Sequence, residues 1–309
     1  MFRPVDPTRN LLDIPSLPAP MIEAYLERTA YYAEKLANKS VDRTVLAGKT
    51  LLNLFFEPST RTRTSFEMAA YRLGANIVNW DPEGSASRKG ESFTDIIQSL
   101  AALRPDGIII RHAKYNTPHM VAQIVDCPVI NAGDSWRAHP TQALADAYTI
   151  LQRKGRLGGL TIAICGDVAQ SRVAACNIAL LSRLGATINL IAPPNFLPPT
   201  LPQANVAVFT DMDEGIRNAD AIIMLHLQKE RLDLSAFSDT IGYHHAYGLT
   251  HDRLRRCKGD VIVLHPGPLN RGVEIADDVA DDPHHSLILQ QAANTLPVRM
   301  AVLDLLLNA

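Results

Sequence analysis

The sequence is poor in cysteine, in aromatic residues and in net charge, and it contains no long apolar run. Only four of its 309 residues are cysteines, and they are scattered, with no Cys-x-x-Cys pair. This pattern argues against a disulfide framework or a zinc site and is typical of a reducing compartment such as the cytoplasm. No segment approaches the ~18 uninterrupted apolar residues of a membrane span. Residues 1–10 also lack the apolar run of a signal peptide.

The near-zero net charge excludes a second set of functions. The formal net charge is −2 and the isoelectric point is about 6.5. A protein that binds nucleic acid or an anionic membrane through a broad basic surface would be distinctly basic. We therefore expect neither partner. Any anionic ligand must be held by a local cluster of positive groups.

The sequence does contain short apolar runs that alternate with helical patterns. At about 150 residues per domain, the length suits two domains, and 47% of the residues are hydrophobic. Several runs are apolar throughout, as expected of parallel strands covered on both faces. The alternation with helices indicates an α/β fold. The predicted strands are residues 51–56, 77–80, 107–110, 128–131, 161–165, 187–192, 206–210, 221–225 and 260–264.

The alternation breaks over residues 141–160, where a helical stretch runs into a basic, glycine-containing segment, and we predict a hinge there. The predicted fold has two similar-sized domains, each a parallel sheet flanked by helices. Residues 1–142 form the first domain, to which a C-terminal helix, 287–309, returns. Residues 143–286 form the second. Ligands of α/β proteins bind at the carboxyl ends of strands, so the chemistry is expected in the loops that follow the strands.

The most informative of these loops carries the string Ser59-Thr60-Arg61-Thr62-Arg63, where a helix is predicted to begin after the strand 51–56. The free backbone N–H groups and the dipole of a helix N-terminus favour an anion. The hydroxyl groups add donors, and the Arg61 guanidinium has the planar shape that suits phosphate. An ordinary helix cap would explain Ser-Thr alone equally well. The complete string, at a strand-to-helix turn, predicts a phosphate site.

This string resembles the phosphate signature of the aspartate/ornithine carbamoyltransferase family, and the resemblance runs from about residue 50 to 305. It implies that carbamoyl phosphate is a substrate. It also implies that the reaction needs no metal or organic cofactor. The contacts implied for the phosphate end are Ser59, Thr60, Arg61 and Thr62.

Two further motifs follow predicted strands of the first domain. Arg111 follows residues 107–110, and by itself it fits a surface ion pair as well as an anion ligand. His139-Pro140-Thr141-Gln142 follows residues 128–131, although a lone histidine is usually structural. By resemblance, Arg111 and His139, together with Thr62, contact the carbonyl oxygen of carbamoyl phosphate. Gln142 is implied to bind its amino group.

A fourth motif, His265-Pro266-Gly267-Pro268, follows the predicted strand 260–264. It resembles the family loop whose backbone carbonyls, here those of Pro266 and Gly267, accept hydrogen bonds from the carbamoyl amine. Prolines help to fix such a turn. Ornithine enzymes typically carry His-Cys-Leu-Pro in this loop and Cys in place of Thr141. The resemblance is therefore to the aspartate type. It implies transfer to L-aspartate, giving N-carbamoyl-L-aspartate and phosphate in pyrimidine biosynthesis.

Residues 85–91, Ser-Ala-Ser-Arg-Lys-Gly-Glu, fit an ordinary polar loop when taken alone. They resemble the family loop that reaches into the active site of a neighbouring subunit. This implies a homotrimer with shared active sites, in which Ser85 contacts carbamoyl phosphate and Lys89 contacts the ligands of an adjacent chain, aspartate among them. A regulatory or dihydroorotase-type partner chain stays open.

The acceptor site contains one departure from the family pattern. Arg172 matches the arginine for the α-carboxylate of aspartate, and Gln228 is retained, but His226 stands where the family has an arginine for the side-chain carboxylate. A neutral imidazole is a weaker and shorter anion partner than a guanidinium. Either His226 serves when protonated, or a nearby arginine such as Arg231 replaces it. Otherwise the acceptor is another amine, or the chain is weakly active or non-catalytic and has a role in assembly. We favour aspartate.

The resemblance also implies a mechanism. Carbamoyl phosphate binds first, and the acceptor amine then attacks the carbamoyl carbon. The catalytic residues are expected to be Arg61, Thr62, Lys89, Arg111 and His139, with the hydrogen-bond donors among them stabilising the developing oxyanion. Phosphate leaves and takes the amine proton. Closure of the two domains would align the reactants and exclude water.

Overall fold

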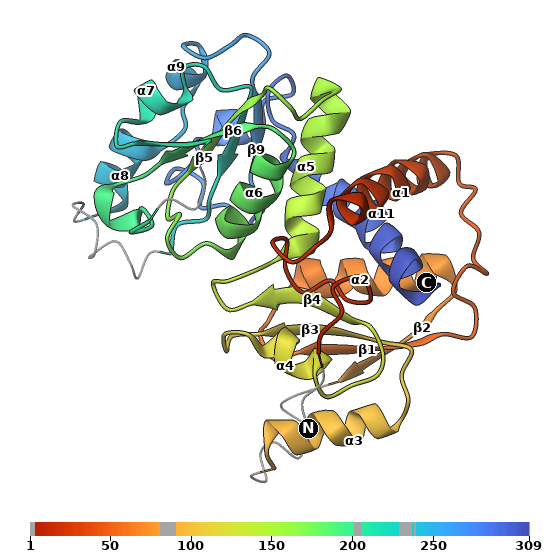
Figure 1. The fold of residues 1–309 in the computed structure, drawn as a ribbon. Helices are drawn as coiled ribbons and strands as arrows, with labels where there is room; N and C mark the ends of the chain where they lie inside the picture. The colour runs from red at the N-terminus through yellow and green to blue at the C-terminus, as the bar shows by residue number, and fades with distance from the viewer. Residues whose placement is uncertain (1–3, 81–90, 201–204, 229–236, 238, 309) are drawn as a thin grey trace. The chain divides into compact units, whose positions relative to one another are not determined.

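The computed structural model describes residues 4–80, 91–200, 205–228, 237 and 239–308. The chain forms two compact units, drawn in Figure 1. Unit 1 comprises Met1–Leu144 and Asn294–Ala309, and unit 2 comprises Ala145–Ala293. Each unit is built around a parallel sheet flanked by helices, so the predicted fold is confirmed. The domain boundaries predicted after residues 142 and 286 stay a prediction.

The sheet of unit 1 has the strand order β2-β1-β3-β4. All three strand pairs are parallel, so the carboxyl ends of the strands lie along one edge. The sheet is open, and β2 and β4 are its edge strands. Its strands are β1 (Thr50–Phe55), β2 (Asn76–Trp80), β3 (Gly107–His112) and β4 (Val129–Asp134).

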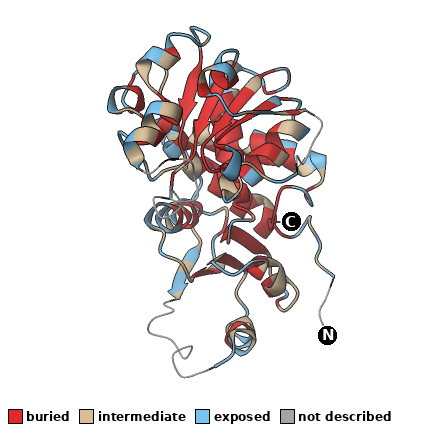
Figure 2. Cartoon of the chain, turned by 90° about the vertical axis from the view of Figure 1, so that its left-hand side faces the viewer, coloured by how far each residue is buried: buried red, intermediate tan, exposed pale blue. Residues whose placement is uncertain are grey.

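Helices cover both faces of this sheet (Figure 1). Helix α2 (Thr60–Leu73) lies on one face, and α1 (Ala19–Ala37) lies on the same side. Helices α3 (Phe93–Ala102) and α4 (Thr117–Ala122) lie on the other. Alternate strand residues, among them Leu52, Leu54 and Ile108, form a buried cluster with residues of α3 and α4. Figure 2 shows these strands as the buried centre of the unit.

The sheet of unit 2 has the order β7-β6-β5-β8-β9, again with every pair parallel. The central strand β5 is apolar on both faces, which explains its uninterrupted hydrophobic run. The strands are β5 (Thr161–Cys165), β6 (Thr187–Ile191), β7 (Val206–Phe209), β8 (Ala221–Met224) and β9 (Ile262–Leu264). The helices are α6 (Arg172–Arg183), α7 (Met212–Ile216), α8 (Thr240–Tyr247), α9 (His251–Leu254) and α10 (Asp277–Ala280), with a short 3₁₀ turn at Pro194–Phe196.

Two helices contribute residues to both units. Helix α5 (Pro140–Lys154) begins in unit 1 and continues in unit 2, and α11 (Ile288–Leu307) begins in unit 2 and ends in unit 1. The end of α11 is fixed within unit 1 by a buried carboxylate, since the Tyr32 hydroxyl of α1 donates to Asp304 over 2.7 Å. The C-terminal helix therefore returns to the first domain, as predicted.

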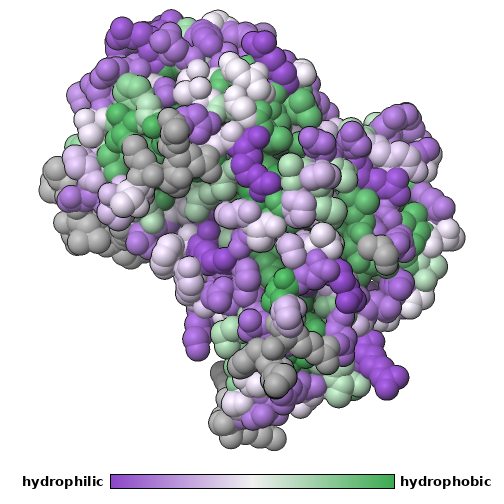
Figure 3. Space-filling model, viewed as in Figure 1, coloured by the Kyte–Doolittle hydropathy of each residue, from purple (hydrophilic) through white to green (hydrophobic). Residues whose placement is uncertain are grey.

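The chemical character of the chain agrees with its composition. The four cysteines are free thiols. In the part of the chain that the structure describes, no helix is both long enough and apolar enough to cross a bilayer. Figure 3 shows hydrophilic residues over most of the visible face, with apolar residues gathered in smaller patches.

Candidate functional site

The predicted ligand residues that the structure describes follow three adjacent strands in each unit. In unit 1 they lie at the ends of β1, β3 and β4, which are neighbours in the sheet. In unit 2 they follow β5, β8 and β9, which are also neighbours. Each sheet thus gathers its predicted residues at its carboxyl edge. They are Ser59, Thr60, Arg61, Thr62, Arg111, His139 and Gln142 in unit 1, and Arg172, His226, Gln228, Pro266 and Gly267 in unit 2.

The phosphate string begins helix α2. Ser59 is the N-cap in an extended conformation, and its side chain makes no capping hydrogen bond. Thr60 and Arg61 are exposed, whereas Thr62 is buried against the unit. The backbone N–H groups at the start of a helix have no acceptor within that helix. This fourteen-residue helix therefore offers backbone donors, hydroxyl groups and the exposed guanidinium of Arg61 to an anion, whereas Arg63, also exposed, pairs with Glu67.

Arg111 lies at the end of β3, beside a shift in the strand register. Its backbone pairs with Phe55 of β1, and the pairing with β4 slips between Ile110 and Arg111. The Arg111 Nε atom lies 3.4 Å from Oε2 of Glu57, and Nη1 lies 3.5 Å from the carbonyl oxygen of Ala132. The side chain is only 13% exposed. Glu57 therefore holds the guanidinium at the sheet edge.

The loop between β4 and α5 is fixed by a buried ion-pair network. Arg137 lies 3.2 Å from the carboxylate of Asp134 and 2.6 Å from that of Asp13. Burial raises the pKa of Asp134, although Arg137 opposes this. Burial would also raise the pKa of Asp13, but hydrogen bonds from His119 and Ser16 and the charge of Arg137 outweigh it, so that the pKa is lowered.

This network directly precedes the third predicted motif. His139 stands one residue before α5, and Thr141 and Gln142 lie in its first turn. All three side chains are buried, with exposed fractions of 5%, 0% and 7%. Because the loop before them is braced on both sides, their positions are set by the fold. Rigid placement of this kind is what a preorganised hydrogen-bonding site requires.

In unit 2, the loop after β9 is held by a chain of buried hydrogen bonds. The His265 backbone N–H donates to Gln291 over 2.8 Å, and Gln291 in turn donates to Asp146 over 2.7 Å. The Gly267 N–H donates to Nδ1 of His265 over 2.8 Å. Since Nδ1 accepts, the proton of a neutral ring resides on Nε2, which lies 3.1 Å from Oε1 of Glu274. The turn at Pro266 and Gly267 is therefore internally fixed.

His226 lies against the same loop. Its Nδ1 atom is 2.9 Å from the carbonyl oxygen of Pro268, so Nδ1 carries a proton and donates. Asn270 Nδ2 lies 3.3 Å from the same ring atom and donates to the Leu227 carbonyl over 2.8 Å. Nε2 makes no hydrogen bond with any described residue. A neutral His226 thus offers an acceptor at Nε2, and only the imidazolium offers a donor there.

The remaining predicted residues of unit 2 flank these strands. Arg172 is the first residue of α6, and the Ser171 side chain caps that helix by accepting from the Ala174 N–H over 3.1 Å. Gln228 is exposed, two residues after His226. Ser85, Lys89 and Arg231 lie outside the described residues, and their predicted roles stay predictions.

The sequence motifs did not indicate the partners that hold these residues. Glu57 stands two residues before Ser59, the start of the phosphate string. A carboxylate at that position was the available signal for a partner of a strand-end arginine. Glu274 and Asn270 brace the loop after β9 but carry no signature of their own. Arg299, a charged residue in the mostly apolar helix α11, is fully buried and was also missed.

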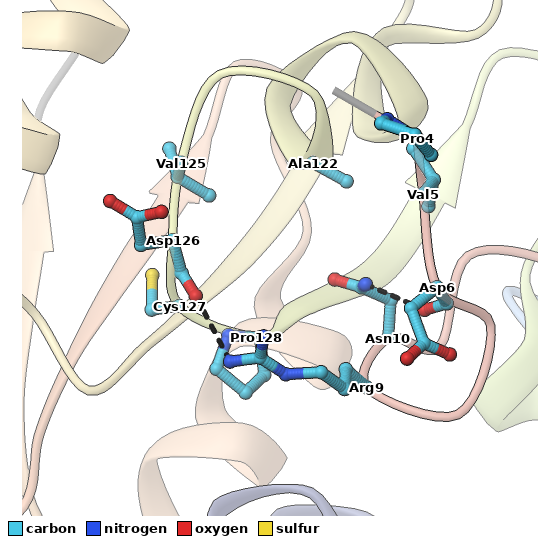
Figure 4. Close-up of a pocket in the computed structure, with 10 residues that line it drawn as sticks. All are labelled: Pro4, Val5, Asp6, Arg9, Asn10, Ala122, Val125, Asp126, Cys127 and Pro128. Atoms are coloured by element: carbon cyan, nitrogen blue, oxygen red, sulfur yellow. Dashed lines mark hydrogen bonds between the residues drawn. The ribbon is translucent and has the colours of Figure 1, made fainter.

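Unit 1 also contains a separate cavity of about 90 Å³. Figure 4 shows Arg9 directed at the carbonyl oxygen of Asp126 and Asn10 directed at Asp6 beside it. Pro128, which precedes β4, lines this cavity, so the cavity lies at the amino end of the strand. The predicted ligand residues lie at the opposite, carboxyl end. The cavity therefore plays no part in the candidate site.

Comparison with known proteins covers almost the whole chain. Residues 9–152 match a family model described as the carbamoyl-P binding domain of aspartate/ornithine carbamoyltransferase. Residues 158–306 match the Asp/Orn binding domain of the same family. The aspartate carbamoyltransferase catalytic subunit of Granulibacter bethesdensis is 48% identical over 297 residues, which are 96% of this chain and 94% of that protein.

Solved structures of both family branches share the fold. Aspartate transcarbamoylase from Trypanosoma cruzi, in complex with N-(phosphonacetyl)-L-aspartic acid, has a TM-score of 0.85 and 28% identity, over 96% of this chain and 94% of that one. Ornithine carbamoyltransferase from Pyrococcus furiosus has a TM-score of 0.87 and 28% identity, over 98% of each chain. The fold by itself therefore does not separate an aspartate enzyme from an ornithine enzyme.

Proposed function

The chain belongs to the aspartate/ornithine carbamoyltransferase family, and we propose that it transfers the carbamoyl group of carbamoyl phosphate to the amine of L-aspartate, giving N-carbamoyl-L-aspartate and phosphate. The observation that carries this proposal is the carboxyl edge of the unit 1 sheet. There the N-terminus of α2, Arg111 and the start of α5 provide donors suited to a phosphate and to a carbonyl oxygen.

The residues of unit 1 take the following roles. Ser59, Thr60 and Arg61 bind the phosphate oxygens at the helix N-terminus. Thr62, Arg111 and His139 donate to the carbamoyl oxygen. An ion pair with Glu57 holds Arg111 at the end of β3, and ion pairs of Arg137 brace the loop before His139. Their donors are therefore in place before charge develops in the transition state, which makes them effective in stabilising it. Gln142 binds the carbamoyl amino group.

The residues of unit 2 take the acceptor. Arg172 pairs with the α-carboxylate of aspartate, and His226 and Gln228 bind its side-chain carboxylate. The carbonyls of Pro266 and Gly267 accept from the carbamoyl amino group, and the hydrogen bonds from Gly267 to His265 and from His265 to Gln291 support this role by fixing the turn.

The chemical step is a substitution at the carbamoyl carbon. The aspartate nitrogen forms a bond to this carbon, and the carbonyl oxygen gains negative charge in the tetrahedral intermediate. The bond from carbon to the phosphate oxygen then breaks. The leaving phosphate takes the proton lost by the amine. The phosphate-binding groups of α2 stabilise the leaving group as its charge grows.

Aspartate is favoured as the acceptor because Thr141 and the loop His265-Pro266-Gly267-Pro268 are of the aspartate type. The curated relatives that carry the aspartate carbamoyltransferase name support the same choice. His226 favours one alternative, an amine with a less acidic side chain, because a neutral imidazole binds a carboxylate poorly.

We also propose a homotrimer in which Ser85 and Lys89 complete the site of a neighbouring chain. An exposed apolar surface supports an interface on unit 1. Met68 and Tyr71 of α2 are 44% and 63% exposed, and Val78 of the edge strand β2 is 49% exposed. The free cysteines support a reducing compartment, and we place the protein in the cytoplasm.

The acceptor is tested by incubating the purified protein with carbamoyl phosphate labelled in the carbamoyl carbon, in the presence of aspartate, ornithine or a panel of other amino acids. We expect the label to appear in carbamoyl aspartate and not in citrulline. Transfer to ornithine or to another amine would replace the proposed acceptor. The absence of transfer to every amine would favour an assembly role.

A further inference from the structure

Arg299 is a fully buried cation in unit 1. It lies on α11, is 2% exposed, and is the largest fully buried side chain among the described residues. Its guanidinium carbon lies 4.7 Å from the centre of the Phe66 ring. Its Nε atom has no hydrogen-bond partner, and no carboxylate of the described residues pairs with it. Burial, reinforced by the positive charge of Arg111, lowers the pKa of Arg299 to about 9, so the side chain remains charged at neutral pH.

A buried charge without a carboxylate partner is unfavourable for folding. The ring of Phe66 offsets part of this cost through a cation–π interaction. The like charge of Arg111 adds to it. A chain that needed only to fill this space would be more stable with an apolar side chain of similar volume. Arg299 therefore indicates a role that depends on its charge.

The position of Arg299 points to that role. Phe66 lies on α2, four residues after Thr62, so the two side chains lie on the same face of the helix. Both are buried, unlike Thr60 and Arg61, which are exposed. Arg299 therefore lies behind the helix whose N-terminus carries the phosphate string, and close enough to Arg111 for the two charges to interact. An anion bound at this edge would relieve their repulsion.

We propose that Arg299 is a positioning residue of the phosphate site. Its charge acts through Arg111 and through the face of α2 on which Phe66 lies, and a phosphate-bearing dianion bound at this edge adds negative charge to that of Glu57, which already pairs with Arg111. Arg299 does not touch the ligand in this account. The inference rests on the proposed function, because that function is what places a dianion at the start of α2.

The coupling between charge and ligand predicts opposite effects on stability and on binding. Arg299→Met removes the charge and keeps an apolar side chain against Phe66. We expect the unliganded variant to melt at the same temperature as the wild type or higher. We expect it to bind inorganic phosphate about tenfold more weakly, as is typical of a coupling between two sites. Arg299→Lys keeps the charge and should retain most of the affinity.

The test is a pair of measurements on the full chain: the melting temperature without ligand, and the dissociation constant of inorganic phosphate by calorimetry. Arg28→Met is the matched control. Arg28 of α1 pairs with Asp304, which lies on α11 as Arg299 does, but the Arg28 side chain is partly exposed. We expect this control to lower the melting temperature and to leave phosphate affinity unchanged.

If Arg299 served packing alone, Arg299→Met would have a lower melting temperature and unchanged phosphate affinity. That result would overturn the inference, and so would failure of this variant to fold. Equal losses of affinity in Arg299→Met and Arg299→Lys would overturn it as well, because charge would then not matter. If the wild type binds neither phosphate nor carbamoyl phosphate, the proposed function fails together with the inference. If the wild type binds both and Arg299→Met binds equally well, only the inference fails.

Discussion

Glu57 and Arg111 form an ion pair across the ends of β1 and β3, with Nε of the arginine 3.4 Å from Oε2 of the glutamate. Their elements are adjacent in the sheet, and the Phe56 N–H donates to the Arg111 carbonyl over 2.9 Å. The pair holds the guanidinium at the edge where we place carbamoyl phosphate. The carboxylate also competes with the ligand for the same charge.

This competition makes the effect of Glu57→Gln predictable. The variant keeps the shape of the side chain but loses its charge, so the phosphate no longer displaces an ion pair. We expect inorganic phosphate to bind about threefold more tightly, since partly exposed ion pairs contribute little free energy. Calorimetry on both proteins measures this. Weaker binding in the variant would mean that Glu57 orients Arg111 more than it competes with the ligand.

The buried pair of His265 and Glu274 should be essential for the stability of unit 2. Oε1 of Glu274 accepts from Nε2 of His265 over 3.1 Å and from the Asn270 N–H over 2.6 Å. Glu274→Ala leaves the buried ring N–H of His265 and the half-buried N–H of Asn270 without this acceptor, and a buried donor left unsatisfied costs about 1–3 kcal/mol. Glu274→Gln keeps an amide oxygen for them and should lose less.

Urea denaturation of the two Glu274 variants compares these losses. Similar losses in both would show that the charge of Glu274, and not its hydrogen bonds, stabilises the loop after β9. No loss in the alanine variant would show that the pair is dispensable.

His112 should contribute to the pH dependence of stability. Its ring packs 4.7 Å from Phe56 and 5.4 Å from Phe93, and burial lowers the pKa of His112 below 6.5. In the unfolded chain this histidine takes up a proton as the pH falls through about 6.5, whereas in the folded chain it stays neutral to a lower pH. Its contribution to stability is therefore complete above about pH 6.5, and it is lost as the pH falls toward the lowered pKa.

His112→Phe tests this account by removing the titrating group. We expect the free energy of unfolding to fall less between pH 7 and pH 5 in the variant than in the wild type, as measured by urea titration at each pH. A variant whose stability follows the same pH profile as the wild type would contradict the assignment.

His226→Arg tests whether the departure at this position weakens acceptor binding. A guanidinium is always charged and can donate two hydrogen bonds to a carboxylate, whereas Nε2 of His226 donates only from the imidazolium. We expect the Michaelis constant for aspartate to fall about tenfold, a typical gain for hydrogen bonds to a charged group. His226→Asn is the control and should raise the constant. An unchanged constant in the arginine variant would mean that another residue holds the carboxylate.

Local patterns in the sequence were sufficient for most of the fold. The run 161–165 is apolar and bounded by turn residues, and β5 occupies those positions. β4 continues to Asp134, three residues beyond its predicted end, because the buried carboxylate there is satisfied by Arg137 and by the Asn116 N–H. Helix α1 was missed, since its N-cap is Pro18 and its first turn holds no acidic residue. The hydrogen bond from the Asn116 N–H to Asp134 joins residues that are 18 positions apart, and it leaves no local pattern in the sequence.

The positions of the candidate residues in the fold were predicted to a similar extent, and their roles stay predictions. The motifs located Arg111, His139 and the phosphate string at strand ends, where the structure has them. The motifs did not reveal Glu57 as the partner of Arg111 or Glu274 as the partner of His265, because these contacts depend on the direction of side chains. Arg299 could not be placed near Phe66 without the packing of α11.

The most direct test of the proposed site compares Arg61→Ala with Arg63→Ala. Both arginines are exposed residues in the first turn of α2, but Arg63 pairs with Glu67, with 3.0 Å between Nε and Oε1. The measurement is steady-state formation of carbamoyl aspartate from labelled carbamoyl phosphate. We predict that Arg61→Ala abolishes turnover while its melting temperature stays that of the wild type, and that Arg63→Ala retains most activity. Near-normal turnover in Arg61→Ala would contradict the assignment of the phosphate site.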